Sequence, residues 1–423
     1  MSILILAILI FLAFFFIKGG RASIFLIAAT YHTFNLFGIK FITIVMALLI
    51  GWMIVTKKKF YLNKFPWLWG FVVCFGSYFL TYFFIDGMKH LNPIVNAFST
   101  FFFPYIFWRF YRPSGGGKGT DCHKFTKYLM IFLVVLFVYS LYEITTIQNP
   151  FVNALLKEDL TNYEQGDEYI RAGIYRARSL TPWCSAYGAA CGLGLTLLLN
   201  MMLRGYIKKS VWKYLLLACL AAGVVISGTR SIMVMTAICV CSVLPLFIKN
   251  FKSLVPLLLL LGILVFANWS IIDETVDSII HHEDAGGSSL EMRNMQYAAA
   301  YHFYEKSPVL GNGLAASGEA ASINAQLLGV ESIIFKTMIN RGLVGLASLI
   351  FLLINSIYVL CRKRCYSLIF IVLGFAFGKV ISALIGSPET FVFFYIIPLM
   401  AEMTCEKNKV KTSTELSRIN KIT

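Results

Sequence analysis

"VVISGTRSIMVM", residues 224–235, sets one permanently charged arginine, Arg230, between two apolar runs. An arginine at the centre of a bilayer costs roughly 2.5–3.5 kcal/mol even on the lenient insertion scale. The position of Arg230 relative to the membrane therefore decides how the surrounding chain is folded.

The composition indicates a membrane protein. The chain has 423 residues, of which 58% are hydrophobic and 14% are charged. Apolar runs of about 17–25 residues, long enough to cross a bilayer, recur from end to end. A soluble protein of this length has too little interior to bury so much apolar surface. The sequence predicts an all-α polytopic membrane protein, with residues 1–423 forming a single integral membrane domain.

The basic residues define the topology. The 37 Lys and Arg residues outnumber the 21 Asp and Glu residues, but they lie in short loops between apolar runs, which is typical of cytoplasmic loops and not of a nucleic-acid site. With these loops inside, segment 22–38 either spans or dips, the tail 404–423 is cytoplasmic, and 12 or 13 spans are expected. The other spans are expected at 3–17, 39–55, 65–85, 91–109, 127–147, 181–203, 211–228, 231–248, 253–270, 335–360, 366–385 and 388–403.

This topology places Arg230. Lys213 and Lys249 both belong to the cytoplasmic side, and the chain between them allows two helices of about 18 residues, each about 27 Å long. The midpoint falls at Ser231. "SGTRS" is therefore expected to be the outward turn of a helical hairpin, with Arg230 at or just below the outer surface.

Two long segments, 149–180 and 271–331, are expected on the same outer side as Arg230. The first holds five acidic residues and the second nine, so the arginines in these segments occur where acidic residues are in excess. Arg171, Arg176 and Arg178 have two interpretations. They either pair with acids of their own loop (Glu164, Asp167 and Glu168) or form a pocket for an anionic group, because the guanidinium fork suits phosphate and pyrophosphate.

Four motifs resemble one family, the O-antigen polymerase and ligase superfamily. "RAGIYRARSLTPWCSAYGAACGLGL" is similar to its arginine-bearing loop that enters a helix, and "VVISGTRSIMVM" to its turn of small residues and arginine. "EMRNMQYAAAYHFYEKSPVLGNGL" resembles its arginine, amphipathic helix and Pro-x-x-Gly-x-Gly. "ESIIFKTMINRGLVGLASL" resembles the segment that opens the next helix. The resemblance covers about 170–360 in the family's order.

The resemblance implies a metal-independent, all-helical glycosyltransferase of GT-C-like architecture that needs no cofactor. Its substrate would be oligosaccharide linked to undecaprenyl pyrophosphate, at the outer face of a bacterial cytoplasmic (inner) membrane. In a Wzy-type polymerase of O-antigen, capsule or exopolysaccharide, the glycan leaves its carrier for a sugar hydroxyl on a new repeat unit. A chain-length regulator and a flippase of the same pathway are the expected partners, besides membrane lipid.

Arg230 and Glu331 are the expected catalytic residues. Guanidinium groups stabilise the charge that develops on a departing pyrophosphate, and a carboxylate near the acceptor hydroxyl acts as general base. Glu331 stands where ligases of the superfamily have His-Asn, which favours a polymerase. Its alternative role is that of a carboxylate stabilised at a helix N-terminus. The expected substrate-binding residues are Arg171, Arg176, Arg178, Glu291, Arg293, His302, Lys336 and Arg341.

Three further interpretations are weighed. Arg341, about 15 Å along the helix from Glu331, is expected to face the bundle interior or a polar cavity. His302 lies on an amphipathic segment where packing is the alternative to catalysis. An O-antigen ligase, or a polysaccharide transporter or flippase, is the alternative function. Transporters often contain internal repeats, and the sequence shows none that is convincing.

Overall fold

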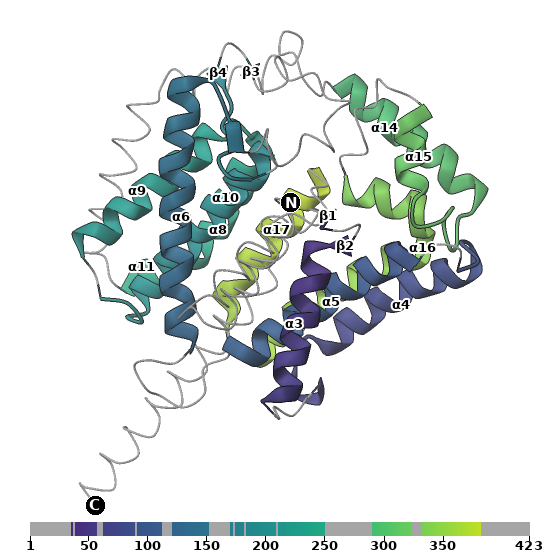
Figure 1. Ribbon diagram of the computed structural model, residues 1–423, viewed down its shortest axis with the longest axis horizontal. Helices are drawn as coiled ribbons and strands as arrows, with labels where there is room; N and C mark the ends of the chain where they lie inside the picture. Colours follow the sequence, from purple (N-terminus) through teal and green to yellow (C-terminus); the bar gives the residue numbers. More distant parts are fainter. Residues whose placement is uncertain are drawn as a thin grey trace, which may run out of the picture.

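The computed structural model describes residues 35–36, 39–56, 62–88, 91–111, 121–151, 170–171, 174–181, 183–208, 210–249, 290–323 and 332–381 (Figure 1). These residues are mainly helical. The exceptions are two antiparallel ladders, β1 (Asn35–Leu36) with β2 (Ile39–Lys40) and β3 (Ile170–Arg171) with β4 (Ile174–Tyr175). The expected all-α fold class is confirmed.

One group of helices is built around the pair α4 (Leu68–Phe84) and α16 (Ile333–Arg362). The 3-10 turn η1 (Leu62–Lys64) leads into α4, and α5 packs on both α3 and α4, while α14 and α15 pack on α16. The bounds of these four helices are Phe41–Val55 for α3, Leu91–Tyr111 for α5, Leu290–Lys306 for α14 and Ala316–Ile323 for α15.

A second group surrounds α8 (Cys184–Leu203), whose residues are almost all buried. Small residues on α8 allow this close packing, because a Cβ on Gly188 would lie 2.8 Å from the Cβ of Ser227. Around α8 lie α6 (Asp121–Thr146), α9 (Val211–Ile226), α10 (Arg230–Val240), η3 (Cys241–Val243) and α11 (Leu244–Lys249).

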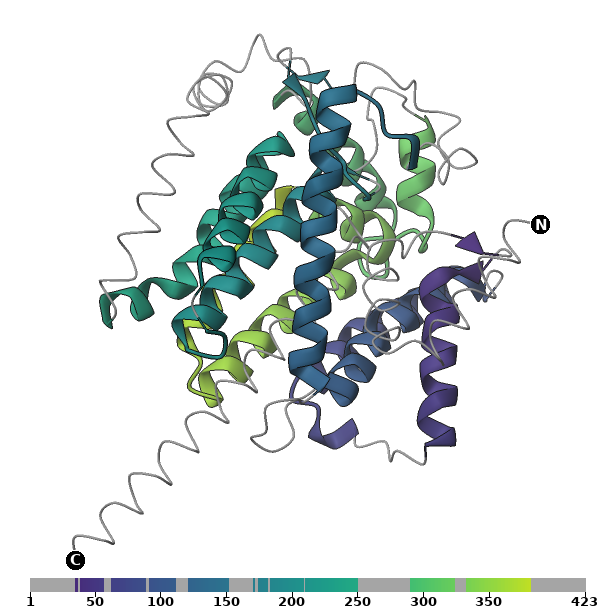
Figure 2. The same cartoon turned by 60° about the vertical axis from the view of Figure 1, so that its left-hand side comes forward.

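Helix α17 (Ile369–Ile381), which follows the 3-10 turn η6 (Tyr366–Leu368), joins the two groups. It packs on α10 of one group and on α16 of the other (Figures 1 and 2). Its approach to α10 depends on Gly374, where a Cβ would lie 2.6 Å from the sulfur of Cys239.

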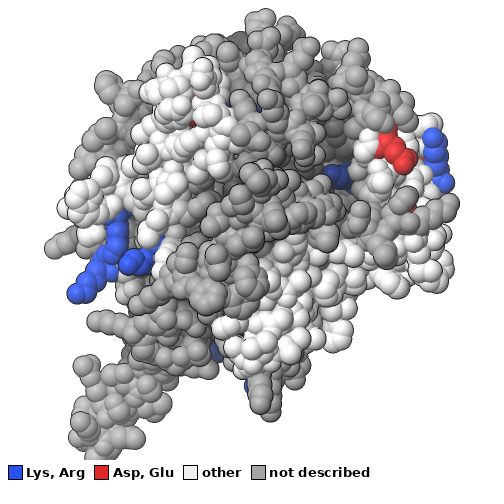
Figure 3. All heavy atoms as spheres, in the orientation of Figure 1, with Lys and Arg blue, Asp and Glu red and all other residues white. Residues whose placement is uncertain are grey.

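Three described helices are long and apolar enough to cross a membrane: Phe125–Thr146, Cys184–Leu203 and Ile333–Arg362. Five shorter apolar helices accompany them: Thr43–Val55, Leu68–Phe84, Val211–Ile226, Arg230–Leu246 and Tyr366–Ile381. On the face drawn in Figure 3, few side chains of described residues are charged. The chain is therefore a multi-helix membrane protein, as the sequence predicts.

The structure locates most of the expected spans. Helix α5 covers 91–109, and α9 ends at Ile226 while α10 begins at Arg230, so "SGTRS" is confirmed as the turn of a helical hairpin. The expected spans 3–17, 253–270 and 388–403 and the tail 404–423 lie outside the described residues, as does most of 22–38. The total of 12 or 13 spans stays a prediction.

Candidate functional site

A carboxylate on α6 holds the arginine-bearing loop 175–181 in place. Glu143 is fully buried in the last turn of α6. Its Oε2 accepts hydrogen bonds from the backbone N–H groups of Arg178 (2.9 Å) and Ser179 (2.5 Å), and its Oε1 accepts one from the Tyr175 hydroxyl (3.1 Å). Burial, followed by the charge of Glu143, raises the pKa of Tyr175, so this hydroxyl stays protonated and donates.

Arg178 is paired with this carboxylate. Its side chain is buried, and its Nε lies 3.7 Å from Glu143 Oε1. The acids expected as its partners lie outside the described residues, and the partner that the structure provides is on α6, outside the loop. An ion pair enclosed in this way fixes the loop geometry, since loss of either member leaves a buried charge uncompensated.

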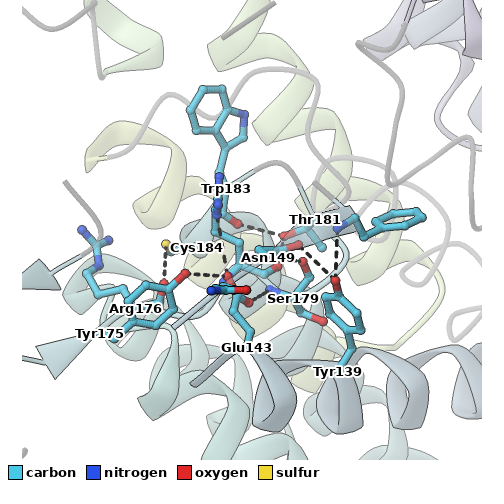
Figure 4. Close-up of polar contacts among 12 residues, drawn as sticks. Tyr139, Glu143, Asn149, Tyr175, Arg176, Ser179, Thr181, Trp183 and Cys184 are labelled. Carbon is cyan, nitrogen blue, oxygen red and sulfur yellow. Dashed lines mark hydrogen bonds and ion pairs between the residues drawn. The ribbon is translucent and has the colours of Figure 1, made fainter. Parts of the chain in front are cut away.

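Neighbouring polar groups complete the support of the loop (Figure 4). Asn149 Nδ2 donates to the Ser179 carbonyl (2.7 Å), and Tyr139 donates from its hydroxyl to Asn149 Oδ1 (3.3 Å). Thr181 Oγ1 donates to the Arg178 carbonyl (2.7 Å). Since these contacts come from α6, from Asn149 just after it and from the loop itself, residues 175–181 are held as a rigid unit.

Arg176 points away from the cluster around Glu143 (Figure 4) and reaches the turn between α9 and α10. Its Nε lies 3.4 Å from the Ser227 carbonyl, and one terminal nitrogen donates to Thr229 Oγ1 (3.1 Å). The turn needs glycine at 228, where φ is +59° and a Cβ would lie 2.7 Å from Arg176 Cγ. The loop and the hairpin turn are thus locked together by one guanidinium.

The charge of Arg230 lies beside that of Arg176. Arg230 is the first residue of α10 and is half-buried. Arg176 bonds Thr229, the residue directly before Arg230, so both arginines belong to the same end of α10. The N-terminus of α10 adds its own partial positive charge. Two arginines converging on a helix N-terminus form a site suited to a phosphate or pyrophosphate.

Helix α16 is broken within its expected span. Gly342 has φ +57° and ψ −149°, so the helix ends at Arg341 and resumes at Leu343. The span expected at 335–360 lies within α16, and the break at Gly342 is a feature that the sequence did not predict. A break in the i→i−4 ladder exposes backbone groups that need new partners in a membrane.

The segment 308–313, from "SPVLGNGL", supplies those partners. Leu343 N–H donates to the Pro308 carbonyl (2.8 Å) and Val344 N–H to the Val309 carbonyl (3.1 Å). In the other direction, Asn312 N–H donates to the Ile339 carbonyl (2.9 Å) and Gly313 N–H to the Asn340 carbonyl (3.3 Å). We refer to this paired region, residues 308–313 with 339–344, as the α16 joint.

Arg341 lies beside the α16 joint and faces the interior, as expected, with 3% of its surface exposed. Its Nη1 donates to Ser77 Oγ (2.6 Å), and its Nη2 donates to Thr337 Oγ1 (3.3 Å). The guanidinium carbon is 3.9 Å from the centre of the Tyr78 ring. All three partners are neutral, so the positive charge of Arg341 is solvated by hydroxyl groups and a ring face.

The remaining expected residues fall at several places. His302 is exposed on α14, where its ring lies edge-on to that of Phe303, whereas Lys336 is half-buried near the start of α16. Glu291 and Arg293 belong to the first turn of α14, and Arg171 ends β3. Glu331 lies outside the described residues.

These residues form two sets, which lie at the same end of the molecule in Figures 1 and 2. The first set consists of Arg230 and the loop of Arg176 and Arg178, in the helix group around α8. The second set lies on α14 and the start of α16, in the other helix group. The sequence did not single out Glu143, although an isolated acid at the end of an apolar run was a signal for it. No sequence pattern indicated that Ser77 and Thr337 would be the hydroxyl partners of Arg341.

Comparisons with known proteins provide one match. Residues 215–350 match a family model described as O-antigen ligase. The matched range contains Arg230, α14, α15, the α16 joint and Arg341, and it excludes Glu143 and the loop 175–181. A comparison with curated proteins gives no match.

Proposed function

We propose, from the premise that residues 215–350 belong to the O-antigen polymerase and ligase superfamily, that this membrane protein is a repeat-unit polymerase. It would join oligosaccharide units carried on undecaprenyl pyrophosphate. The superfamily implies an enzyme of glycosyl transfer in general. The polymerase activity and the lipid carrier are the specific content of the proposal.

The observation that carries this proposal is the convergence of Arg176 and Arg230 on the N-terminus of α10. Like charges held side by side are stabilised by an anion between them. A pyrophosphate offers two phosphate groups to two guanidinium forks. The lipid carrier of a glycan contributes just such an anion at the membrane surface.

In the proposed reaction, the bond between the anomeric carbon of the donor glycan and the pyrophosphate oxygen breaks. The anomeric carbon forms a new bond to a hydroxyl oxygen of the acceptor unit, whose proton passes to a general base. Arg176 and Arg230 stabilise the negative charge on the departing pyrophosphate. Guanidinium groups can supply this stabilisation without a metal.

Other residues have proposed roles on the same site. Glu331 is the proposed general base or acceptor-positioning group, and Glu291 and His302 are next in rank. Arg171, Arg293, Lys336 and Arg341 are proposed to contribute to glycan or pyrophosphate binding. Arg178, paired with Glu143, supports the proposal by positioning the loop of Arg176.

The proposed location is the cytoplasmic membrane of a bacterium, with the site facing the exterior and the C-terminus in the cytoplasm. The short basic loops support this orientation. A flippase would deliver the lipid-linked units, and a chain-length regulator would act on the growing polymer.

The second candidate is an O-antigen ligase, which the description of the matching family favours. Both enzymes break the same bond, and they differ in the acceptor. A polymerase uses another lipid-linked unit, whereas a ligase uses a finished lipid core. Glu331-Ser332 in place of His-Asn supports the polymerase.

Deletion of the protein, followed by sizing of the surface glycan and of the carrier-linked glycan, tests the proposal. Loss of a polymerase should leave single repeat units, still made and flipped. Long polymer stranded on the carrier would contradict the proposal and establish a ligase. Re-expression of the intact chain should restore the polymer and serves as the control.

A further inference from the structure

Helix α14 exposes a row of tyrosines. Tyr297 is 52% exposed and Tyr301 is 45% exposed, and Tyr304 follows one turn later. The spacing of four and then three residues places all three on one face of the helix. Ring centroids of Tyr297 and Tyr301 are 6.3 Å apart in a stacked arrangement, and those of Tyr301 and Tyr304 are also 6.3 Å apart.

The row extends onto a second helix and rests on a fixed base. Phe335, at the start of α16, lies edge-on to Tyr297 with centroids 5.7 Å apart. Next to the row on α14, Ala300 is fully buried in a cluster with Ile339 and Ala316. We call the four residues Tyr297, Tyr301, Tyr304 and Phe335 the aromatic row. Its backbone is anchored on the rigid α16 joint, so its rings are held in a set geometry.

Most of the other exposed surface of α14 is polar. The carboxylate of Glu305, one turn after Tyr301, flanks the aromatic row, and its charge raises the pKa of the Tyr301 hydroxyl. His302 and Lys306 are exposed on the side of α14 turned away from the row. The exposed residues of the membrane helix α6 are different in kind, because Val134, Val135 and Val138 form an aliphatic face.

We propose that the aromatic row binds the sugar rings of the glycan substrate, a subsite that rests on the proposed function. The C–H face of a sugar ring packs on the face of an aromatic ring, and the tyrosine hydroxyls bond sugar hydroxyls at the rim. An aromatic row of this kind accepts successive units of a chain, as stacking platforms do for nucleotides.

The competing occupant is the membrane surface, because tyrosines also gather at lipid headgroups. The polar exposed surface of α14 favours the glycan. An interfacial helix buries a broad apolar face, whereas the exposed surface of α14 beyond the narrow row of rings carries Glu305, His302 and Lys306.

Binding of single repeat units to the full-length protein in lipid nanodiscs tests the proposal. The probe is the cell's own surface glycan, hydrolysed to free repeat-unit oligosaccharide and followed by saturation-transfer NMR. Tyr297→Ala and Tyr301→Ala should each weaken binding about threefold to tenfold. Tyr297→Phe and Tyr301→Phe keep the ring and should stay within about twofold of wild type.

Tyr358→Ala is the matched control, because Tyr358 is 59% exposed on the distant part of α16 and should bind like wild type. Unchanged affinity in both alanine variants at positions 297 and 301 would overturn the proposal. So would strong quenching of a Tyr301→Trp variant by brominated lipids, which would place the row in the membrane surface.

The oligosaccharide probe contains no pyrophosphate and undergoes no transfer, so this test is independent of turnover. Binding that is lost in the alanine variants while the deletion strain still makes full-length polymer would reject the polymerase and keep a glycan site. Normal polymerase activity with no dependence of binding on the aromatic row would reject the subsite alone.

Discussion

At the scale of single residues, Glu143 and Arg178 show how a charge is kept inside an apolar bundle. Both side chains are almost fully buried, and the carboxylate also accepts two backbone N–H groups and a phenol. The desolvation cost of two ions is offset only when each has close partners. The pair therefore specifies the geometry of loop 175–181 more than it adds to stability.

Removal of one member of the Glu143–Arg178 pair should lower the stability of the protein. Glu143→Gln leaves the Arg178 guanidinium buried without its anion and should destabilise the protein by about 3 kcal/mol. Thermal unfolding in detergent should show a lower Tm. The double variant Glu143→Leu with Arg178→Met replaces the pair by apolar side chains and should recover most of the loss. Glu305→Gln, an exposed carboxylate on α14, is the control, and a Tm of Glu143→Gln equal to this control would show that the pair is not needed.

The arginines of the candidate site should not tolerate lysine. Arg176→Lys loses the fork that bonds Ser227 and Thr229, and Arg230→Lys loses bidentate recognition of phosphate. Each change should lower the polymer yield at least about tenfold at equal expression. Arg362→Lys, exposed at the far end of α16, should have no effect. Normal polymer in both lysine variants would make the two arginines structural.

Sequence reasoning found the arginines but not what holds them. Arg176 and Arg230 were predictable because each stands in a motif of small residues on the same side of the expected topology. Their closeness depends on packing of α6, α8 and α9, which brings positions about 50 residues apart into contact. Glu143 lies 35 residues before Arg178, and local patterns do not report contacts at that separation.

At the scale of elements, α16 shows why hydropathy misses a break. The run from Ile333 to Arg362 is apolar enough to cross a membrane as one helix, and a single glycine inside such a run is common. What interrupts it is the segment 308–313, which replaces the lost hydrogen bonds on both sides of Gly342. No pattern in the sequence indicated that the turn at Gly311 and Gly313 pairs with α16.

Gly342→Ala should disrupt the α16 joint. The combination of φ +57° with ψ −149° is accessible almost only to glycine, and a Cβ would lie 2.5 Å from the Pro308 carbonyl. The change should lower stability by at least about 2 kcal/mol, measured by thermal unfolding in detergent. Gly76→Ala in α4 is the matched control, since a Cβ there meets nothing within 4 Å and the helix gains stability. Equal Tm values for the two variants would contradict this account of the joint.

At the scale of the whole molecule, two helix groups meet through α17, and β3, β4 and α14 lie at the same end (Figure 1). Composition and basic loops were enough to predict the class, the positions of most helices and the α9–α10 hairpin. They did not predict the two groups or the central place of α8. Those features follow from small residues that meet across helices, and a sequence alone does not pair such residues.

The orientation is testable by labelling. In a cysteine-free background, single cysteines at Asn294, Val309 and Gly318 should react with an impermeant thiol reagent in intact cells. Cysteines at Arg362 and Tyr366 should react only after permeabilisation, because short basic loops stay in the cytoplasm. All five positions are on described segments, and those of Val309 and Tyr366 are strongly exposed. The reverse pattern would invert the topology and move the proposed reaction to the other face.

The α16 joint has a consequence for anyone who builds chimeras of this protein. Segment 308–313 and α16 are separate along the chain. Each of them relies on the other for some of its backbone hydrogen bonds. A graft that exchanges residues 308–313 and keeps the native α16 would place foreign residues against the break at Gly342. The smallest exchangeable module therefore runs unbroken from about Lys306 to Val344.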